Sequence, residues 1–165
     1  MQSHDNLPLA GQVAVITGAA KGIGRGIAQA FSAAGADIVI ADIDAVEMPN
    51  TVSLVEANGR RVLALQADMR IEADIDRIAD STLQRFGRVD VVVNNAGINA
   101  PGGFLGVSRT DIRSVFDTDL IGPFFLSQRF ACEMIRLDIK GRIVCISSIH
   151  SVVPAYCPKR SSRRP

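Results

Sequence analysis

The segment that most constrains the fold of this chain is a glycine-rich turn at Thr17–Gly24, which reads Thr-Gly-Ala-Ala-Lys-Gly-Ile-Gly. An apolar run, Val13–Ile16, precedes the turn, and apolar residues at helical spacing follow it. This pattern predicts a strand, a tight turn and a helix whose first N–H groups could face a phosphate. Taken alone, the turn is equally consistent with a plain strand–helix connection.

Two later segments make a nucleotide site the better interpretation of the turn. Asp42 ends the next apolar run, Ile38–Ala41, and lies 24 residues after Gly18. A carboxylate at such a position can accept hydrogen bonds from the ribose of an adenosine. A third apolar run, Val91–Val93, is closed by Asn94–Gly97. Together these segments predict a dinucleotide site at the ends of parallel strands.

The turn and the Asn-Asn-Ala-Gly segment resemble those of the classical short-chain dehydrogenase/reductase family. The likeness runs from about Leu9 to about Pro154, and a weaker likeness in Ile146–His150 points to the glucose and polyol dehydrogenase-like members. The resemblance implies a nicotinamide cofactor and hydride transfer between that cofactor and an alcohol or ketone. It also implies a Rossmann-like fold.

The apolar runs are continuous rather than alternating, which predicts parallel strands buried on both faces with helices on each side. We expect an α/β, doubly wound sheet with strand order 3-2-1-4-5. Residues 1–154 would form one NAD(P)-binding domain, and residues 155–165 an atypical basic tail. The expected strands are 12–17, 37–41, 61–66, 89–94 and 142–147, and after a first helix ending near Gly35 the expected helices are 46–58, 71–86, 108–116 and 118–137.

Composition and charge exclude several other classes of protein. Outside Lys159–Pro165 the chain holds 14 basic and 17 acidic residues, which gives no electrostatic basis for binding nucleic acid. The three cysteines lack metal-ligand spacing, so we expect no metal site. The start of the chain lacks a signal-peptide pattern, and no apolar stretch approaches the roughly 20 residues that span a membrane. We therefore expect a soluble, cytoplasmic protein.

Asp42 favours NAD over NADP, because a carboxylate there bonds the ribose hydroxyls and repels a 2′-phosphate. Lys21 argues weakly for NADP by the resemblance, and a solvated lysine at a helix start is an equal alternative. The resemblance places Asp68 beside the adenine, with a helix-capping aspartate as the alternative. The candidate cofactor-binding residues are Gly18, Lys21, Gly22, Ile23, Gly24, Asp42, Asp68, Asn95, Ala96 and Gly97.

The resemblance implies four catalytic groups: a serine, a tyrosine, a lysine four residues after the tyrosine, and an asparagine on the long helix. Ser148 matches the serine, and the only tyrosine, Tyr156, follows it by eight residues instead of about a dozen. Arg160 stands where the lysine is expected, and Asp119 stands at the asparagine position. Ser148 and Tyr156 are therefore the catalytic candidates. Because their spacing differs from the family pattern, whether the chain is an active enzyme stays open.

Family members reach about 250 residues as a single domain, whereas this sequence ends nine residues after Tyr156. We therefore expect a C-terminally truncated member whose last strand is an exposed apolar edge that promotes self-association. The main hypothesis is an oxidoreductase acting on a small alcohol or ketone. The alternatives are a catalytically impaired dinucleotide-binding module and an oligomerisation partner that uses helix 118–137.

Overall fold

The computed structural model describes residues 7–101 and 103–148, and within them five parallel strands form one sheet. The sheet order β3-β2-β1-β4-β5 confirms the predicted 3-2-1-4-5 topology. The strands are β1 (Val13–Thr17), β2 (Asp37–Asp42), β3 (Val62–Gln66), β4 (Val91–Asn94) and β5 (Arg142–Cys145).

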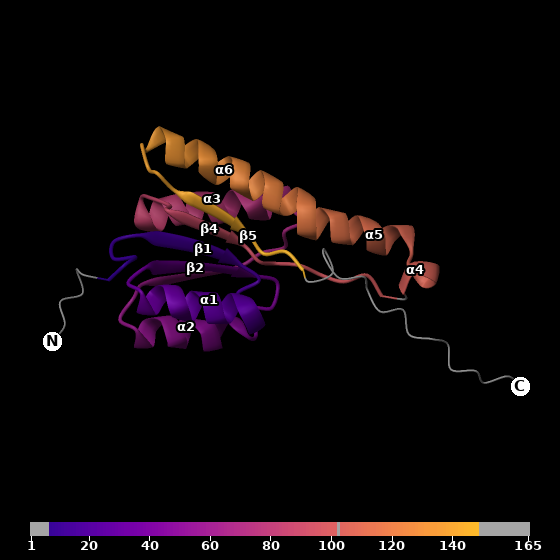
Figure 1. Ribbon diagram of the computed structural model, residues 1–165, viewed down its shortest axis with the longest axis horizontal. Coiled ribbons are helices and arrows are strands. Elements are labelled where there is room, and N and C mark those ends of the chain that lie inside the picture. The colour runs from indigo at the N-terminus through magenta and orange to yellow at the C-terminus, as the bar shows by residue number, and fades with distance from the viewer. Residues whose placement is uncertain (1–6, 102, 149–165) are drawn as a thin grey trace, which may run out of the picture.

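Helices cover both faces of the sheet, as a doubly wound fold requires (Figure 1). The helices α1 (Gly22–Ala33) and α2 (Met48–Ala57) lie against one face. The helices α3 (Glu72–Phe86) and α6 (Gly122–Arg136) lie against the other. A helix follows each of the first three strands. The connection from β3 through α3 to β4 passes from one side of β1 to the other, which places α3 and α6 on the face opposite α1 and α2.

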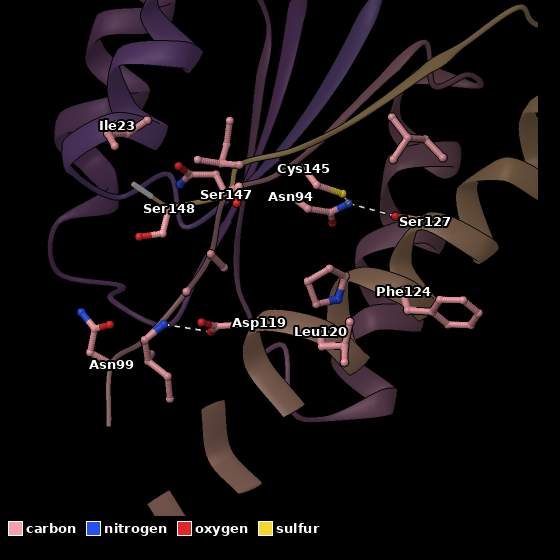
Figure 2. A pocket seen from close by; sticks show the side chains of 17 residues that line it. Ile23, Asn94, Asn99, Asp119, Leu120, Phe124, Ser127, Cys145, Ser147 and Ser148 are labelled. Carbon is pink, nitrogen blue, oxygen red and sulfur yellow. Dashed lines mark hydrogen bonds between the residues drawn. The ribbon is translucent and has the colours of Figure 1, made fainter. Parts of the chain in front are cut away.

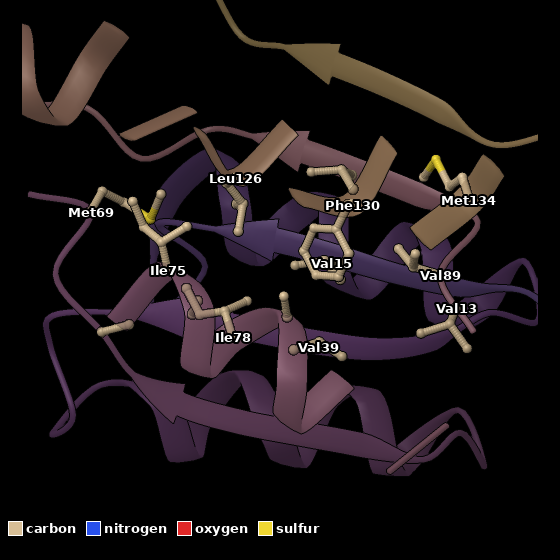
Figure 3. Packing of buried hydrophobic residues seen from close by; sticks show 14 residues of the cluster. Val13, Val15, Val39, Met69, Ile75, Ile78, Val89, Leu126, Phe130 and Met134 are labelled. Atoms are coloured by element: carbon tan, nitrogen blue, oxygen red, sulfur yellow. The ribbon is translucent and has the colours of Figure 1, made fainter. Parts of the chain in front are cut away.

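The larger apolar core lies between the sheet and the α3–α6 face (Figure 3). Phe130 and Leu126 of α6 meet Ile78 of α3 over Val15 and Val39 of the two central strands, and all five are completely buried. The opposite face of the same strands packs against α1 and α2 in a second cluster. The central strands are therefore apolar on both sides, as the continuous runs predicted.

The two edge strands depart from that prediction. Every residue of β5 is exposed, and β3 alternates between half-buried and exposed positions. The prediction of burial on both faces is wrong for these strands, because each has a neighbouring strand on one side only. The expected apolar edge at the last strand is present, with Ile143 and Val144 both exposed.

The segment after β4 is more helical than predicted. A short helix, α4 (Gly103–Gly106), lies between the expected strand 89–94 and the expected helix 108–116, where no element was predicted. The helix α5 (Arg109–Phe116) begins with a capping box between Ser108 and Asp111, close to the start of the predicted helix 108–116. A π-helical segment, Asp117–Ile121, then joins α5 directly to α6. The predicted break between two helices is therefore wrong, because the wider π turn carries the chain through without interruption.

Candidate functional site

Two adjoining clefts lie at the carboxyl ends of the strands. The larger has a volume of about 960 Å³ and the smaller about 530 Å³. Both are lined by Ile23 of α1 and by the segment Asn95–Ile98 that follows β4. The clefts therefore share a wall, and an elongated ligand could occupy both. Figure 2 shows the larger cleft with its lining side chains.

The glycine-rich turn between β1 and α1 forms the base of this region, and two of its glycines are required by packing. A Cβ atom on Gly18 would lie 2.8 Å from the Cα of Ala96, and one on Gly24 would overlap the carbonyl oxygen of Gly18. Gly22 has a φ of +58° but faces open space. Gly18 lines the smaller cleft, and Gly18 and Gly24 permit the close packing of the turn.

Asn95 fastens the end of β4 to this turn. Its side-chain amide donates to the carbonyl oxygens of Thr17 and Gly18 at 2.9 and 3.0 Å. The Thr17 hydroxyl in turn accepts from the backbone N–H groups of Asn95 and Ala96 at 3.1 and 3.0 Å. Asn95 therefore has a structural role, and these bonds fix the wall that the two clefts share.

Asp42 lies at the end of β2 and lines the smaller cleft. One carboxylate oxygen accepts from the Ala20 N–H at 2.8 Å, and the other accepts from the Asp44 N–H at 2.9 Å. A carboxylate offers about four lone-pair positions, so each oxygen retains capacity for a ligand hydroxyl. The carboxylate is therefore held in place by the turn and can still accept hydrogen bonds.

Lys21 has an acidic partner that the sequence analysis missed. Its ammonium group lies 3.1 Å from a carboxylate oxygen of Asp44, and both residues line the smaller cleft. The hydrogen bond to Asp44, with the charge of that carboxylate, raises the pKa of Lys21. Lys21 is the N-cap of α1 and 69% of its side chain is exposed, so the alternative of a solvated lysine at a helix start stays open beside this ion pair. In the sequence, the only indication of this pair is that Asp44 follows Asp42 by two residues.

Asp68 follows β3 and also lines the smaller cleft. The capping alternative is wrong, because the N-cap of α3 is Ile71, which makes no side-chain cap. Asp68 instead binds the Arg70 guanidinium, with Nε at 2.9 Å from one oxygen, and this hydrogen bond lowers the pKa of Asp68. Arg70 is a further lining residue that sequence reasoning missed, since nothing in the motif indicated it.

Ser148 and Asp119 both line the larger cleft (Figure 2). Asp119 lies in the π-helical segment, and its Oδ1 accepts from the Ile98 N–H at 3.0 Å. The side-chain oxygen of an asparagine could accept the same hydrogen bond. Asp119 can therefore replace the expected asparagine as an acceptor for the Ile98 N–H. Tyr156, the second catalytic candidate, lies outside the described residues.

Asn94 and Ser127 are polar lining residues of the larger cleft that the sequence did not single out as a pair. The buried Asn94 amide donates to the Ser127 hydroxyl at 2.9 Å. Among residues 7–101 and 103–148 there is no group of three or more His, Cys, Asp or Glu side chains that could hold a metal. Within the same ranges, none of the helices has both the length and the apolar character that crossing a membrane requires.

Comparison with known proteins gives matches over most of the chain. A family model for short chain dehydrogenase matches residues 12–158. The 7alpha-hydroxysteroid dehydrogenase of Escherichia coli K12 is 37% identical over 134 residues, covering 81% of this chain and 52% of that relative. A metagenomic short-chain oxidoreductase in complex with NADP superposes with a TM-score of 0.83 at 33% identity, covering 89% of this chain and 66% of that one.

A second solved structure, a short chain dehydrogenase from Mycobacterium paratuberculosis bound to NAD, has a TM-score of 0.80 at 35% identity and covers 85% of this chain and 56% of that one. Both nicotinamide cofactors therefore occur among similar structures. The chain spans about half the length of the curated relatives it matches. The family model covers far more than half of the chain, and the sheet order agrees with the expectation from the motifs. This chain belongs to the short-chain dehydrogenase family.

Proposed function

We propose that this protein is an oxidoreductase that binds NAD across the two clefts and acts on a small alcohol or ketone. The observation that carries the proposal is the shared wall at Asn95–Ile98, with Asp42 in the cleft on one side and Ser148 in the cleft on the other. A dinucleotide has two halves joined by a pyrophosphate, and this arrangement offers each half its own cleft.

The residues present fit such a cofactor. Gly22 opens on free space, and the first turn of α1 contains no acidic residue that would repel a phosphate. Lys21, the N-cap of this helix, makes no side-chain cap to the backbone, so the first N–H groups of the helix remain available to an anion. The pyrophosphate would lie at this helix terminus, between the two clefts.

The smaller cleft would take the adenosine half. Asp42 would accept hydrogen bonds from the ribose hydroxyls, and Asp68 would face the adenine edge beside Arg70. A 2′-phosphate at the same ribose would bring a second negative charge close to the fixed Asp42 carboxylate, which is unfavourable in a partly buried site. We therefore propose NAD rather than NADP as the preferred cofactor.

The larger cleft would take the nicotinamide half and the substrate. When bound, the nicotinamide supplies or accepts the hydride. The Ser148 hydroxyl would donate a hydrogen bond to the substrate oxygen, and the Tyr156 phenol would exchange a proton with it. Asp119 would act as a positioning residue by holding Ile98, a residue of the shared wall.

A second candidate function is a module that binds the cofactor without turnover. The observation that favours it is Asp119, because a carboxylate in the larger cleft cannot donate a hydrogen bond as the expected asparagine amide would. This candidate shares the adenosine site with the first and differs from it only in chemistry. Cofactor oxidation in the presence of ketones would distinguish the two.

The test is a titration of the full chain with NADH and with NADPH, followed by cofactor fluorescence. We expect NADH to bind more tightly, and Asp42→Ala to lower the ratio of NADH to NADPH affinity by about tenfold, since about 1.4 kcal/mol of charge discrimination is lost. Asp42→Ala also removes the hydrogen bond from the Ala20 N–H. Any loss of affinity from this cause affects NADH and NADPH equally and does not change their ratio. The control is Asp76→Ala, an exposed carboxylate on α3 outside both clefts. An unchanged ratio in Asp42→Ala would contradict the proposed role.

A further inference from the structure

Lys21 and Asp44 form an ion pair on the wall of the smaller cleft, next to Asp42. The two side chains differ in exposure to solvent: 69% of the Lys21 side chain is exposed, but only 27% of the Asp44 side chain. A flexible cation is thus held by a more fixed anion, beside the position proposed for the adenosine ribose.

Asp44 makes two hydrogen bonds besides its pair with Lys21. Its N–H donates to the Asp42 carboxylate at 2.9 Å, and its Oδ1 accepts from the Glu47 N–H at 3.2 Å. Only Oδ2 is directed to Lys21, at 3.1 Å. The carboxylate therefore keeps its place whether or not Lys21 is bound, whereas Lys21 can swing away.

From this geometry we propose that Asp44 is a specificity-determining residue that holds Lys21 away from the 2′-phosphate of NADP and so strengthens the preference for NAD. The inference rests on the proposed function, because it concerns the same adenosine site. Two carboxylates would then discriminate between NAD and NADP. Asp42 would contact the ribose, and Asp44 would keep the Lys21 ammonium group from the 2′-phosphate.

The charges around Lys21 support this role. A 2′-phosphate carries between one and two negative charges at neutral pH, so it would need Lys21 as a counter-ion. To reach the phosphate, Lys21 would have to leave Asp44, and the attraction within that ion pair would be lost. The other charged groups near Lys21 are Asp42 and Glu47, and both of these also favour its charged form. Glu47 is itself paired with Arg25 at 2.8 Å, which leaves Asp44 as the direct partner of Lys21.

A double-mutant cycle on the full chain tests the proposal, with cofactor fluorescence as the readout. Asp44→Asn removes the charge and keeps an oxygen that can accept from the Glu47 N–H. We expect this variant to lower the NADH-to-NADPH affinity ratio by about fivefold, a change typical of one ion pair near a protein surface. In the Lys21→Gln background the same substitution should change the ratio by less than about twofold, because there is no cation to release.

The outcomes separate this inference from the proposed function. An equal effect of Asp44→Asn with and without Lys21 would mean simple repulsion by Asp44 and would overturn the inference. Tight NADH binding by the wild-type chain with an unchanged ratio in Asp44→Asn would overturn the inference alone. Failure of the wild-type chain to bind either cofactor would overturn the proposed function and the inference together. Asp44→Ser, which also offers an oxygen to Glu47, provides a second charge-free variant if Asp44→Asn folds poorly.

Discussion

Gly24 and Gly26 lie in the same turn of α1 but have opposite surroundings. A Cβ atom on Gly24 would overlap the Gly18 carbonyl, whereas one on Gly26 would have no heavy atom within 4 Å. We expect Gly24→Ala to lower the free energy of unfolding by about 3 kcal/mol through overpacking. Gly26→Ala should raise it by about 0.5–1 kcal/mol, because alanine favours the helix. Urea denaturation followed by circular dichroism measures both, and equal effects would contradict the close packing.

Asp37 at the start of β2 is expected to make stability depend on pH. Burial of this carboxyl raises its pKa, but hydrogen bonds from Arg61 and the nearby charges of Arg60 and Arg61 outweigh that effect, so the pKa lies below its usual value. A depressed pKa in the folded state stabilises the protein above the unfolded-state pKa, and the stabilisation is lost as the pH falls.

We therefore expect the free energy of unfolding to decrease as the pH falls from about 5 to about 2, with a shallower decrease in Asp37→Asn. Other carboxyls with lowered pKa values, such as Asp74 and Glu133, leave part of the slope in place. Asp76→Asn, at an exposed position on α3, is the matched control and should keep the wild-type slope. Identical slopes in both variants would contradict the role of Asp37.

At the residue scale, the sequence could predict groups whose place follows from the chain itself. Gly18 and Asp42 directly follow the predicted strands 12–17 and 37–41, so their convergence needs only the sheet order, and Gly24 lies in the first turn of the helix that follows. Ion-pair partners such as Lys21 and Asp44 are 23 residues apart, and their contact depends on how two separate loops approach. That approach is a property of the packed structure, which no local pattern contains.

At the scale of elements, α6 is the helix whose packing the core depends on most visibly (Figure 3). Phe130 is completely buried in the core, whereas Phe124 on the same helix is 59% exposed. We expect Phe130→Ala to lower the free energy of unfolding by about 3–5 kcal/mol, and Phe124→Ala by less than about 1 kcal/mol. Chemical denaturation of both variants checks this, and a comparable cost at the two positions would contradict the burial.

The sequence predicted those helices and strands whose apolar residues follow a clear pattern. β1, β2 and β4 are continuous apolar runs, and their order follows from the handedness of parallel crossovers. The burial of β3 and β5 was not predictable from their sequences, because an edge strand and a central strand can carry the same apolar residues. The π-helical segment Asp117–Ile121 was also missed, since one additional residue per turn leaves no clear periodic signal over five residues.

For the whole molecule, β5 is an edge strand of the sheet within the described residues, and its apolar side chains Ile143 and Val144 are exposed. We expect self-association, seen as a weight-average mass that rises above 17.6 kDa with concentration in sedimentation experiments. Val144→Lys should weaken this association by about tenfold or more, because a charge at an edge strand opposes pairing. Val46→Lys, an equally sized change at an exposed position between β2 and α2, is the control and should have little effect. A monodisperse monomer at high concentration would contradict the prediction.

The hydrogen bond from the Ile98 N–H to Asp119 has a consequence for motion. Ile98 lies outside every strand and helix and is 42% exposed, so its amide hydrogen would ordinarily exchange rapidly with solvent deuterium. Because it is bonded to Asp119, that amide exchanges only when the shared wall of the two clefts separates from the π-helical segment Asp117–Ile121. Its exchange rate therefore reports how often the wall opens. This rate should rise in Asp119→Ala and stay near that of the wild-type chain in Asp119→Asn, which keeps the accepting oxygen.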